Sequence, residues 1–192
     1  MSIFDEAYSG VPNWEIGRPQ REFVTLEETG EIRGDVLDVG CGTGENALLL
    51  AERGHKVWGV DSVPRAIELA REKARERDLS VTFLVQDALD RENFSRTFDT
   101  IIDSGLFHAL SDPDRLRFVR SLAAVLRPGG TYFMLTLSDL EPGKNGPRRV
   151  TQQEIRAAFE DGWRINWIRA AVFEGRWQPA GYLAWLSSIT RV

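Results

Sequence analysis

Short apolar runs alternate with longer amphipathic stretches along the chain from about residue 35 onward. The apolar runs are typical of strands buried on both faces of a sheet. The stretches between them repeat apolar residues at helical spacing, and Ala66, Ile67 and Ala70 form one such face. Buried strands that alternate with helices predict an α/β fold with a parallel sheet. The expected strands are 35–40, 56–61, 81–87, 98–103 and 130–137, and the expected helices include 64–78 and one from Asp112 to the Pro-Gly-Gly stop at 128–130.

The end of the chain follows a different pattern. Two strand-like runs, 163–173 and 180–189, are joined by only six residues, EGRWQP. So short a link allows an antiparallel hairpin but not the crossover that parallel strands need. Before the hairpin, Thr151 followed by Glu154 has the form of a capping box, so we expect a helix to begin there.

The composition excludes several classes of function. With 192 residues, of which 42% are hydrophobic and 28% charged, the chain is expected to form one globular domain. A net charge of -5 argues against a nucleic-acid partner, because phosphate binding favours a basic surface. Cys41 is the only cysteine, which suits a reducing cytoplasm. No apolar run reaches membrane-spanning length and the N-terminus lacks signal-peptide features, so we expect a cytoplasmic protein with no membrane partner. We also expect no metal ion at the site.

The segment VLDVGCGTGENA, where an expected strand ends and a helix begins, is the clearest candidate for ligand binding. Gly40, Gly42 and Gly44 allow a tight turn and the close approach of a ligand to the helix N-terminus. Alone, such a loop also fits NAD binding or a purely structural turn. Asp61 ends the next expected strand at a separation suited to binding a ribose diol. Asp38, just before the loop, would repel a pyrophosphate but attract an ammonium group. The expected ligand is therefore a nucleoside with a cationic amino-acid tail, as in S-adenosylmethionine.

Five segments in order, DVLDVGCGTG, VWGVDSV, FLVQDAL, FDTIIDSGLFHAL and LRPGG, resemble the motif series of class I S-adenosylmethionine-dependent methyltransferases. The resemblance covers residues 30–140 well and the terminal hairpin more loosely. It implies a Rossmann-like, seven-stranded, mostly parallel sheet of order 3-2-1-4-5-7-6, with the last strand antiparallel and helices on both sides. It also implies S-adenosylmethionine as cofactor and S-adenosylhomocysteine as its product.

The same resemblance implies cofactor contacts at particular positions. In that family the glycine loop would hold the methionine part and Asp61 the ribose hydroxyls. Asp87 and the amide of Ala88 would contact the adenine edge, although Asp87 alternatively caps a loop. The expected cofactor-binding residues, including two from the N-terminal arm, are Trp14, Arg18, Asp38, Gly40, Cys41, Gly42, Thr43, Gly44, Asp61, Ser62, Asp87, Ala88, Asp103 and Ser104.

The stretch NWEIGRPQ resembles the segment that precedes the core in halide/thiol, thiopurine and bacterial heterocyclic-toxin methyltransferases. In those relatives the Trp and Arg belong to an arm that folds over the cofactor. We therefore expect residues 1–29 to form an arm or lid and 30–192 to form the methyltransferase domain. Trp14 would face the sulfonium and Arg18 would donate to the methionine carboxylate. The alternative is that Trp14 and Pro19 only anchor the arm to the core.

The methyl acceptor is expected to be a small molecule. Enzymes that methylate exocyclic amino groups of bases carry an Asn-Pro-Pro-Tyr-type motif after the fourth strand, where this chain has DSGLFH. His108 is the one candidate general base, because imidazole titrates near neutrality and the residue follows Asp103 by five positions. Its apolar neighbours in GLFHAL favour the alternative of a packed histidine that supports the loop.

Aromatic side chains are candidates for the walls of an acceptor pocket: Phe4, Tyr8, Phe107 and Trp177. The position of Trp177 depends on which end of the sheet carries the last hairpin. We expect a methyltransferase acting on O, S or N of a small aromatic or heterocyclic acceptor. The alternatives are a halide or thiol methyltransferase that needs no base, an NAD(P)-binding oxidoreductase and a non-catalytic nucleotide-binding module. Monomer and homodimer both remain open.

Overall fold

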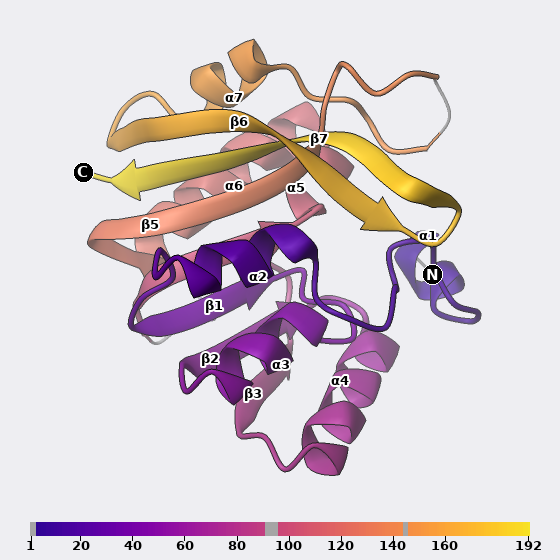
Figure 1. Cartoon of the computed structure of the whole chain (residues 1–192). Coiled ribbons are helices and arrows are strands. Elements are labelled where there is room, and N and C mark those ends of the chain that lie inside the picture. Colours follow the sequence, from indigo (N-terminus) through magenta and orange to yellow (C-terminus); the bar gives the residue numbers. More distant parts are fainter. Residues whose placement is uncertain (1–2, 91–95, 144–145) are drawn as a thin grey trace.

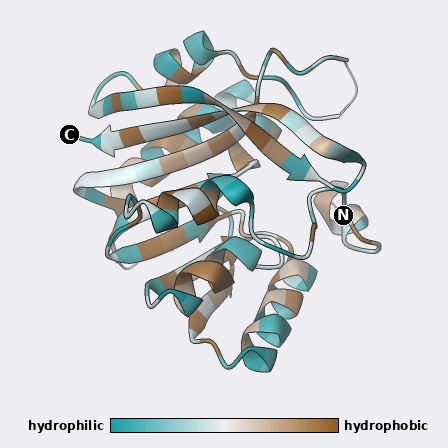
Figure 2. Ribbon diagram, viewed as in Figure 1, coloured by the Kyte–Doolittle hydropathy of each residue, from teal (hydrophilic) through white to brown (hydrophobic). Residues whose placement is uncertain are grey.

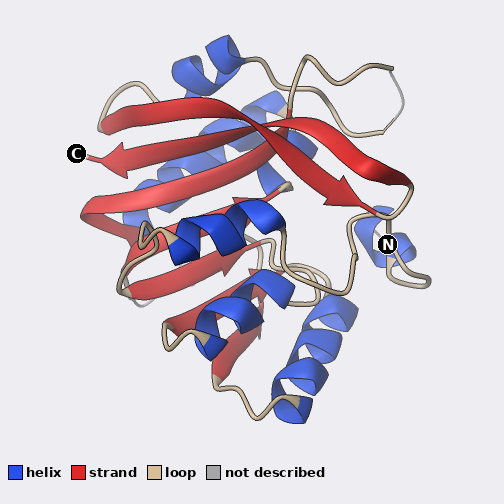
Figure 3. Ribbon diagram, in the orientation of Figure 1, coloured by secondary structure: helices blue, strands red, loops and turns tan. Residues whose placement is uncertain are grey.

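One twisted sheet runs through the middle of the molecule in the computed structural model, which describes residues 3–90, 96–143 and 146–192 (Figure 1, Figure 3). The sheet has seven strands in the order β3-β2-β1-β4-β5-β7-β6. β7 pairs antiparallel with both neighbours, and the other pairs are parallel. This confirms the sheet order and the antiparallel last strand that the motif series implies. The strands are β1 Asp35–Val39, β2 Lys56–Asp61, β3 Val81–Val85, β4 Phe98–Ser104, β5 Leu126–Leu137, β6 Trp163–Gly175 and β7 Gln178–Arg191.

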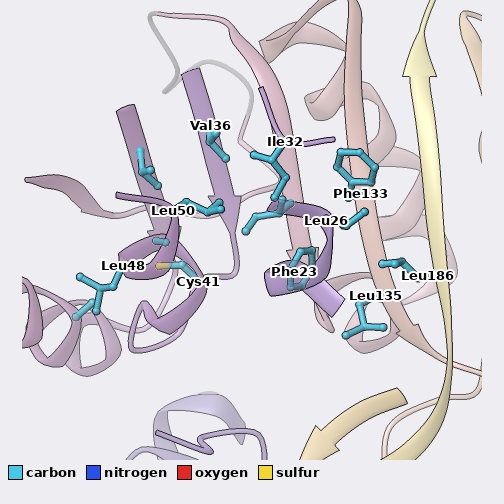
Figure 4. Close-up of a cluster of buried hydrophobic side chains, with 14 of the residues drawn as sticks. Phe23, Leu26, Ile32, Val36, Cys41, Leu48, Leu50, Phe133, Leu135 and Leu186 are labelled. Carbon is cyan, nitrogen blue, oxygen red and sulfur yellow. The ribbon is translucent and has the colours of Figure 1, made fainter. Parts of the chain in front are cut away.

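Helices cover both faces of this sheet, and a hydrophobic cluster fills the space on each side. On one face, α2, α3 and α4 bury residues such as Phe23 and Leu26 against Phe133 (Figure 4). On the other face, α5, α6 and α7 pack over Tyr132 and Met134. Figure 2 shows the consequence, since apolar positions gather along the strands and polar positions along the outer helix surfaces. The helices are α1 Ile3–Ala7, α2 Arg21–Glu28, α3 Glu45–Glu52, α4 Pro64–Glu76, α5 Leu106–Ala109, α6 Asp112–Val125 and α7 Gln152–Ala158.

Local sequence signals explain where several helices start and stop. Thr151 and Glu154 form the expected capping box at α7, and α4 starts at a proline, whose fixed φ suits a first turn. The expected end of α6 at Pro-Gly-Gly is wrong by a few residues. The helix stops at Val125, and the 128–130 segment belongs to β5, where a bulge lets the strand regain register with β4.

The carboxyl ends of the parallel strands meet at one edge of the sheet, which we call the carboxyl edge. β7 pairs Ala184 with Leu137, the last residue of β5, so the hairpin between β6 and β7 extends beyond this edge. The segment before α2 runs along the same edge and reaches the hairpin (Figure 1). Among the described residues, no helix has the length and apolar character needed to cross a membrane.

Candidate functional site

The glycine loop turns the chain from β1 into α3 at the carboxyl edge. Gly40, Gly42 and Gly44 all have positive φ, at 65°, 54° and 85°, which L residues with a side chain adopt only with strain. Close packing adds a second requirement, because a Cβ on Gly40 would lie 3.1 Å from Cβ of Leu106 and one on Gly44 would lie 2.6 Å from Phe83. The expected tight turn is therefore present, and it contacts α5 directly.

Asp61 supports the loop from the end of β2. Its carboxylate accepts hydrogen bonds from the N–H groups of Gly42 and Val63, each at 2.9 Å. Burial raises the pKa of Asp61, and these backbone hydrogen bonds act in the opposite direction. The side chain thus links the glycine loop to the start of α4. Its expected contact with a ribose stays a prediction.

Asp38 is the least satisfied polar group at this edge. It is 1% exposed, and neither carboxylate oxygen has a hydrogen-bond partner among the described residues. Burial, followed by the nearby charge of Asp103, raises its pKa well above the ordinary value. The N–H of Ala47 lies near enough to offset a little of that rise without completing a hydrogen bond. A buried carboxylate without a partner is costly, so the position fits a cationic group such as the ammonium of an amino acid.

Asp103, by contrast, is fully engaged. It accepts hydrogen bonds from the N–H of Leu106 at 2.7 Å, the N–H of Phe107 at 3.1 Å and the hydroxyl of Tyr132 at 2.7 Å. Burial raises its pKa to about 6, while these donors, the Tyr132 hydroxyl first, oppose the rise. The carboxylate therefore fastens the start of α5 to the end of β4. Ser104, half-buried, follows it as the last residue of the strand.

The expected adenine-binding residues lie after β3. Asp87 is exposed and accepts a hydrogen bond from the N–H of Leu89 at 2.9 Å, so it does cap its own turn. Ala88 packs against the core, whereas Ser62 is exposed. The amide Nε2 of Gln86, next to Asp87, is buried without a partner among the described residues. Sequence reasoning missed Gln86, and its place directly before the acidic residue was the available signal.

Three aromatic residues of the N-terminal segment come together above the glycine loop. The ring of Trp14 meets those of Phe4 and Tyr8 edge to face, with centroids 6.0 Å and 6.2 Å away. The indole N–H of Trp14 donates to the hydroxyl of Tyr8 at 3.1 Å. That hydroxyl lies 2.8 Å from where a Cβ on Gly42 would be. Burial raises the pKa of Tyr8, so it remains a neutral phenol. The arm thus carries an aromatic cluster, Phe4, Tyr8 and Trp14, directly onto the loop.

Polar contacts hold the arm in this position at two points. Near the loop, Glu15 binds the hydroxyl of Thr43 and lies 3.3 Å from Nζ of Lys73. Thr43 itself accepts a hydrogen bond from Lys73 at 2.6 Å, so this expected cofactor residue takes part in anchoring the arm. Glu45 completes the cluster, because it binds Lys73 and Arg77. Of the anchoring residues in this cluster, only Thr43 was expected at the site.

The second anchor is the β6–β7 hairpin. Asn13 accepts a hydrogen bond from the N–H of Trp177 through its side chain at 2.9 Å, and its backbone carbonyl accepts one from Arg176. Arg18 forms two hydrogen bonds of 2.9 Å with Glu174. Its guanidinium is therefore directed at the hairpin, and its expected bond to a methionine carboxylate would require a change of partner. Trp177 lies at the carboxyl edge with 78% of its surface exposed, which answers the question of which end carries the hairpin.

His108 sits between the glycine loop and the hairpin, on α5. Its Nδ1 accepts a hydrogen bond from the N–H of Leu137 at 3.1 Å, and its ring meets Phe173 edge to face at 5.7 Å. Burial, then the charges of Arg115 and Arg149, lower its pKa to about 3. A neutral ring that accepts at Nδ1 carries its proton on Nε2. This geometry makes His108 a hydrogen-bond donor at Nε2 and gives no support to a general base.

Phe107 does not line an open site. It is fully buried on the other face of the sheet, with its ring centroid 6.0 Å from that of Phe159. The expectation that it forms an acceptor wall is therefore not supported, because α5 alternates its side chains between His108 at the edge and Phe107 in the core. Cys41, the small residue within the loop, is also buried.

Sequence reasoning left out three arginines, of which Arg115 and Arg149 are close enough to His108 to lower its pKa. Arg115 is 5% exposed, and its Nε donates to the carbonyl of Phe107 at 3.0 Å. Arg148 pairs with Asp112 and Glu154. Arg149 donates to the carbonyls of Pro142 and Pro147. Arg149 thus adds positive charge near His108.

A hollow of about 800 Å³ lies at the opposite edge of the sheet and contains none of the expected site residues. Charged and aromatic side chains line it, among them Arg33, Asp99, Arg127 and Trp167, and Arg127 pairs with Asp99. We therefore place the candidate site at the carboxyl edge, where ligands of open α/β sheets bind.

The chain is similar to known methyltransferases. The methyltransferase domain family matches residues 36–130. The 2-heptyl-1-hydroxyquinolin-4(1H)-one methyltransferase of Mycobacteroides abscessus is 38% identical over 182 residues, a match that covers 89% of this chain and 80% of that protein. A structure described under the conversion of a disulfide bond into a thioacetal group during echinomycin biosynthesis has a TM-score of 0.90 at 35% identity and covers 98% of this chain and 92% of its own.

A more distant structure shows the fold alone. Magnesium protoporphyrin IX methyltransferase from Synechocystis, solved with bound S-adenosylmethionine, has a TM-score of 0.70 at 21% identity. The match covers 88% of this chain and 76% of that protein.

Proposed function

Because the chain belongs to the class I S-adenosylmethionine-dependent methyltransferases that act on small molecules, we propose that its acceptor is a compact ring compound and that the methyl group goes to a hydroxyl oxygen on that ring. The observation that carries this proposal is the match to the hydroxyquinolinone methyltransferase over 89% of the chain, far beyond the cofactor motifs. The aromatic cluster of the arm adds support, since it gives this edge flat apolar surfaces suited to a ring.

The cofactor is S-adenosylmethionine, and the residues at the carboxyl edge fit its charge distribution. Asp38 would bind the ammonium, which removes the cost of a buried carboxylate without a partner. Asp61, already oriented by two backbone donors, would bind the ribose hydroxyls with its remaining lone pairs. Asp87 and Ala88 would contact the adenine, with the free amide of Gln86 as a further donor. These roles are proposals that rest on the chemistry of each group.

When bound, the cofactor supplies a methyl group on a positively charged sulfur. The protein's part is to align the acceptor with that group and to exclude water. The arm serves the second task, because Trp14 and Tyr8 lie over the glycine loop, and Glu15 and Asn13 fasten the segment to that loop and to the hairpin. An electron-rich indole face would also stabilise a nearby sulfonium by a cation–π interaction.

A second acceptor class is favoured by one observation. The structure described under conversion of a disulfide bond into a thioacetal group is similar over 98% of this chain, which includes nearly all of the arm and the hairpin. Sulfur methylation on this scaffold is therefore the alternative to oxygen methylation. Both reactions use the same cofactor geometry and differ in the acceptor atom.

An acceptor panel separates these proposals. The protein is incubated with methyl-labelled S-adenosylmethionine and four matched ring compounds that carry a hydroxyl, an N-hydroxyl, a thiol or an amino group. Mass spectrometry then locates the methyl group. We expect the highest kcat/KM for the hydroxyl or N-hydroxyl compound. A higher kcat/KM for the thiol would establish the sulfur alternative, and binding of cofactor without transfer to any compound would indicate a non-catalytic protein.

A further inference from the structure

The hydrogen bond from Leu137 to Nδ1 of His108 determines what this ring can do. Since a backbone N–H always donates, Nδ1 must be the unprotonated nitrogen and Nε2 must carry the proton. No described residue binds Nε2. The ring is packed against Phe173, and α5, which carries His108, contacts the glycine loop through Leu106 and Gly40. His108 therefore offers one N–H donor between the cofactor loop and the hairpin.

Arg149 is a cation without a carboxylate partner among the described residues. Its hydrogen bonds go to two backbone carbonyls, those of Pro147 at 2.5 Å and Pro142 at 3.4 Å. Its Nε is buried and has no partner there. Nearby, Arg115 has a buried Nη2 that also lacks a partner, although its charge is balanced at 3.6 Å by Asp112 and at 3.8 Å by Glu154. The region beside His108 thus carries an excess of positive charge.

Acidic groups near His108 are engaged elsewhere. Asp103 accepts hydrogen bonds from α5 and Tyr132. On the loop after β5, Glu141 accepts the N–H of Leu183 at 2.6 Å and Asp139 accepts the indole N–H of Trp185 at 3.1 Å. On β6, Glu174 is bound to Arg18. Among these four carboxylates, none is placed as a free proton acceptor for a substrate.

We propose that the enzyme binds its acceptor as an anion, with the Nε2–H of His108 donating a hydrogen bond to it and Arg149, supported by Arg115, supplying the positive field. The acceptor class is then a ring hydroxyl, N-hydroxyl or thiol acidic enough to lose its proton near neutral pH. This inference rests on the proposed function, because it concerns the acceptor of the same methyl transfer. It adds that none of the residues described at this edge acts as general base.

The methyl transfer balances without any group on the protein that takes up a proton. The acceptor loses its proton to solvent before it binds. A lone pair on the anionic oxygen or sulfur forms the new bond to the methyl carbon, and the carbon–sulfur bond of the cofactor breaks with its electron pair on sulfur. One negative and one positive charge disappear, leaving a neutral methylated product and a neutral thioether.

A series of ring-substituted phenols and thiophenols of graded acidity tests the proposal. The pH profile of kcat/KM is measured for each compound. We expect the rate to rise with pH through the pKa of each acceptor, so that the inflection moves from compound to compound. An inflection at one constant pH for all acceptors would identify an enzymic base and overturn the proposal.

Variants of His108 and Arg149 provide the second arm. Gln at position 108 cannot act as a base, but its amide can still donate near the position of Nε2. We expect His108→Gln to keep most of the activity and the moving inflection, whereas His108→Leu loses about tenfold or more in kcat/KM. Equal loss in both variants, with melting temperatures unchanged, would contradict the donor role.

Arg149→Gln should raise KM for anionic acceptors about tenfold while leaving KM for a neutral ring amine unchanged. Arg148→Gln is the matched control from the same loop, because its charge is already paired with Asp112 and Glu154. An equal effect of the two variants would assign Arg149 to loop anchoring.

If no hydroxyl or thiol acceptor is methylated, the proposed function fails. If they are methylated with an inflection at one constant pH, only the present inference fails.

Discussion

At the scale of single residues, Asp38 ties the fold to the cofactor most directly. A carboxyl group that is 1% exposed and has no hydrogen-bond partner in the described part of the chain destabilises the free protein whenever it is ionised. The same group gains a partner when an ammonium binds. The sequence placed this residue correctly at the loop, because an acidic residue two positions before Gly40 is visible without a structure. Its lack of hydrogen bonds depends on packing and was not predictable.

The Asp38→Asn variant separates the cost of the buried charge in the free protein from the contribution of Asp38 to cofactor binding. We expect it to weaken S-adenosylhomocysteine binding by roughly 1.5–3 kcal/mol, the range for a lost hydrogen bond to a charged group. Calorimetry on the wild type and the variant measures this difference. Unchanged affinity would mean that the ammonium binds elsewhere. Asp90→Asn serves as a control that removes one exposed acid from the same protein.

The same variant should change the pH dependence of stability. Because the pKa of Asp38 is raised in the folded state, this group stabilises the wild type fully below its unfolded-state pKa of about 3.9. That contribution to stability is lost as the pH rises through the folded-state pKa. Asn does not titrate. The free energy of unfolding of Asp38→Asn, relative to wild type, should therefore increase with pH from about 4 upward in the absence of cofactor. Denaturant titrations at pH 5 and 8 measure it, and a constant difference would contradict the burial argument.

At the scale of elements, the arm and the hairpin form one unit at the carboxyl edge. The arm binds the hairpin through Asn13 and Arg18, and it binds the loop region through Glu15. Sequence reasoning predicted the capping box of α7 and the antiparallel hairpin. It assigned all of residues 1–29 to an arm, whereas Arg21–Glu28 forms α2, whose Phe23 and Leu26 are buried in the core. It did not predict the contacts of the arm with the hairpin, because Arg18 and Glu174 are 156 positions apart. Sequence reasoning also assigned Phe107 to the pocket, where the structure gives it no support. The direction of side chains on the short α5 follows from tertiary packing, which the sequence pattern does not reveal.

Glu15→Gln should loosen the arm with little effect on the core. The residue binds Thr43 and Lys73, while Lys73 keeps its 2.7 Å contact with Glu45. We expect faster hydrogen exchange in residues 8–20 and a change in unfolding free energy below about 1 kcal/mol. Hydrogen-exchange mass spectrometry reports the first and denaturant unfolding the second. Glu68→Gln, which breaks the exposed pair with Arg65, makes the same charge change away from the arm and should leave that exchange unchanged.

At the scale of the whole molecule, the sheet brings distant segments to one edge. The parallel strands carry the glycine loop, Asp61 and Asp103 there, and β7, which pairs antiparallel with β5, extends the hairpin beyond the same edge. The apolar runs predicted a parallel sheet and the terminal hairpin, whereas the strand order was implied by the resemblance to the methyltransferase motif series. Arg115 and Arg149 were not predicted beside His108, since the burial of Arg115 on α6 depends on packing and Arg149 lies in a segment without a periodic pattern.

The most direct measurement of the central claim is the initial rate of transfer from trideuteromethyl-labelled S-adenosylmethionine to a 1-hydroxyquinolin-4(1H)-one. The rate is compared between the full chain and a form lacking residues 1–19, which keeps the bonds of Gln20 to Glu174 and Asn46. We expect the full chain to give the labelled product and the shortened form to be slower by about tenfold or more, because water enters an uncovered site. No labelled product from a full chain that binds the cofactor, or an equal rate from both forms, would contradict the account.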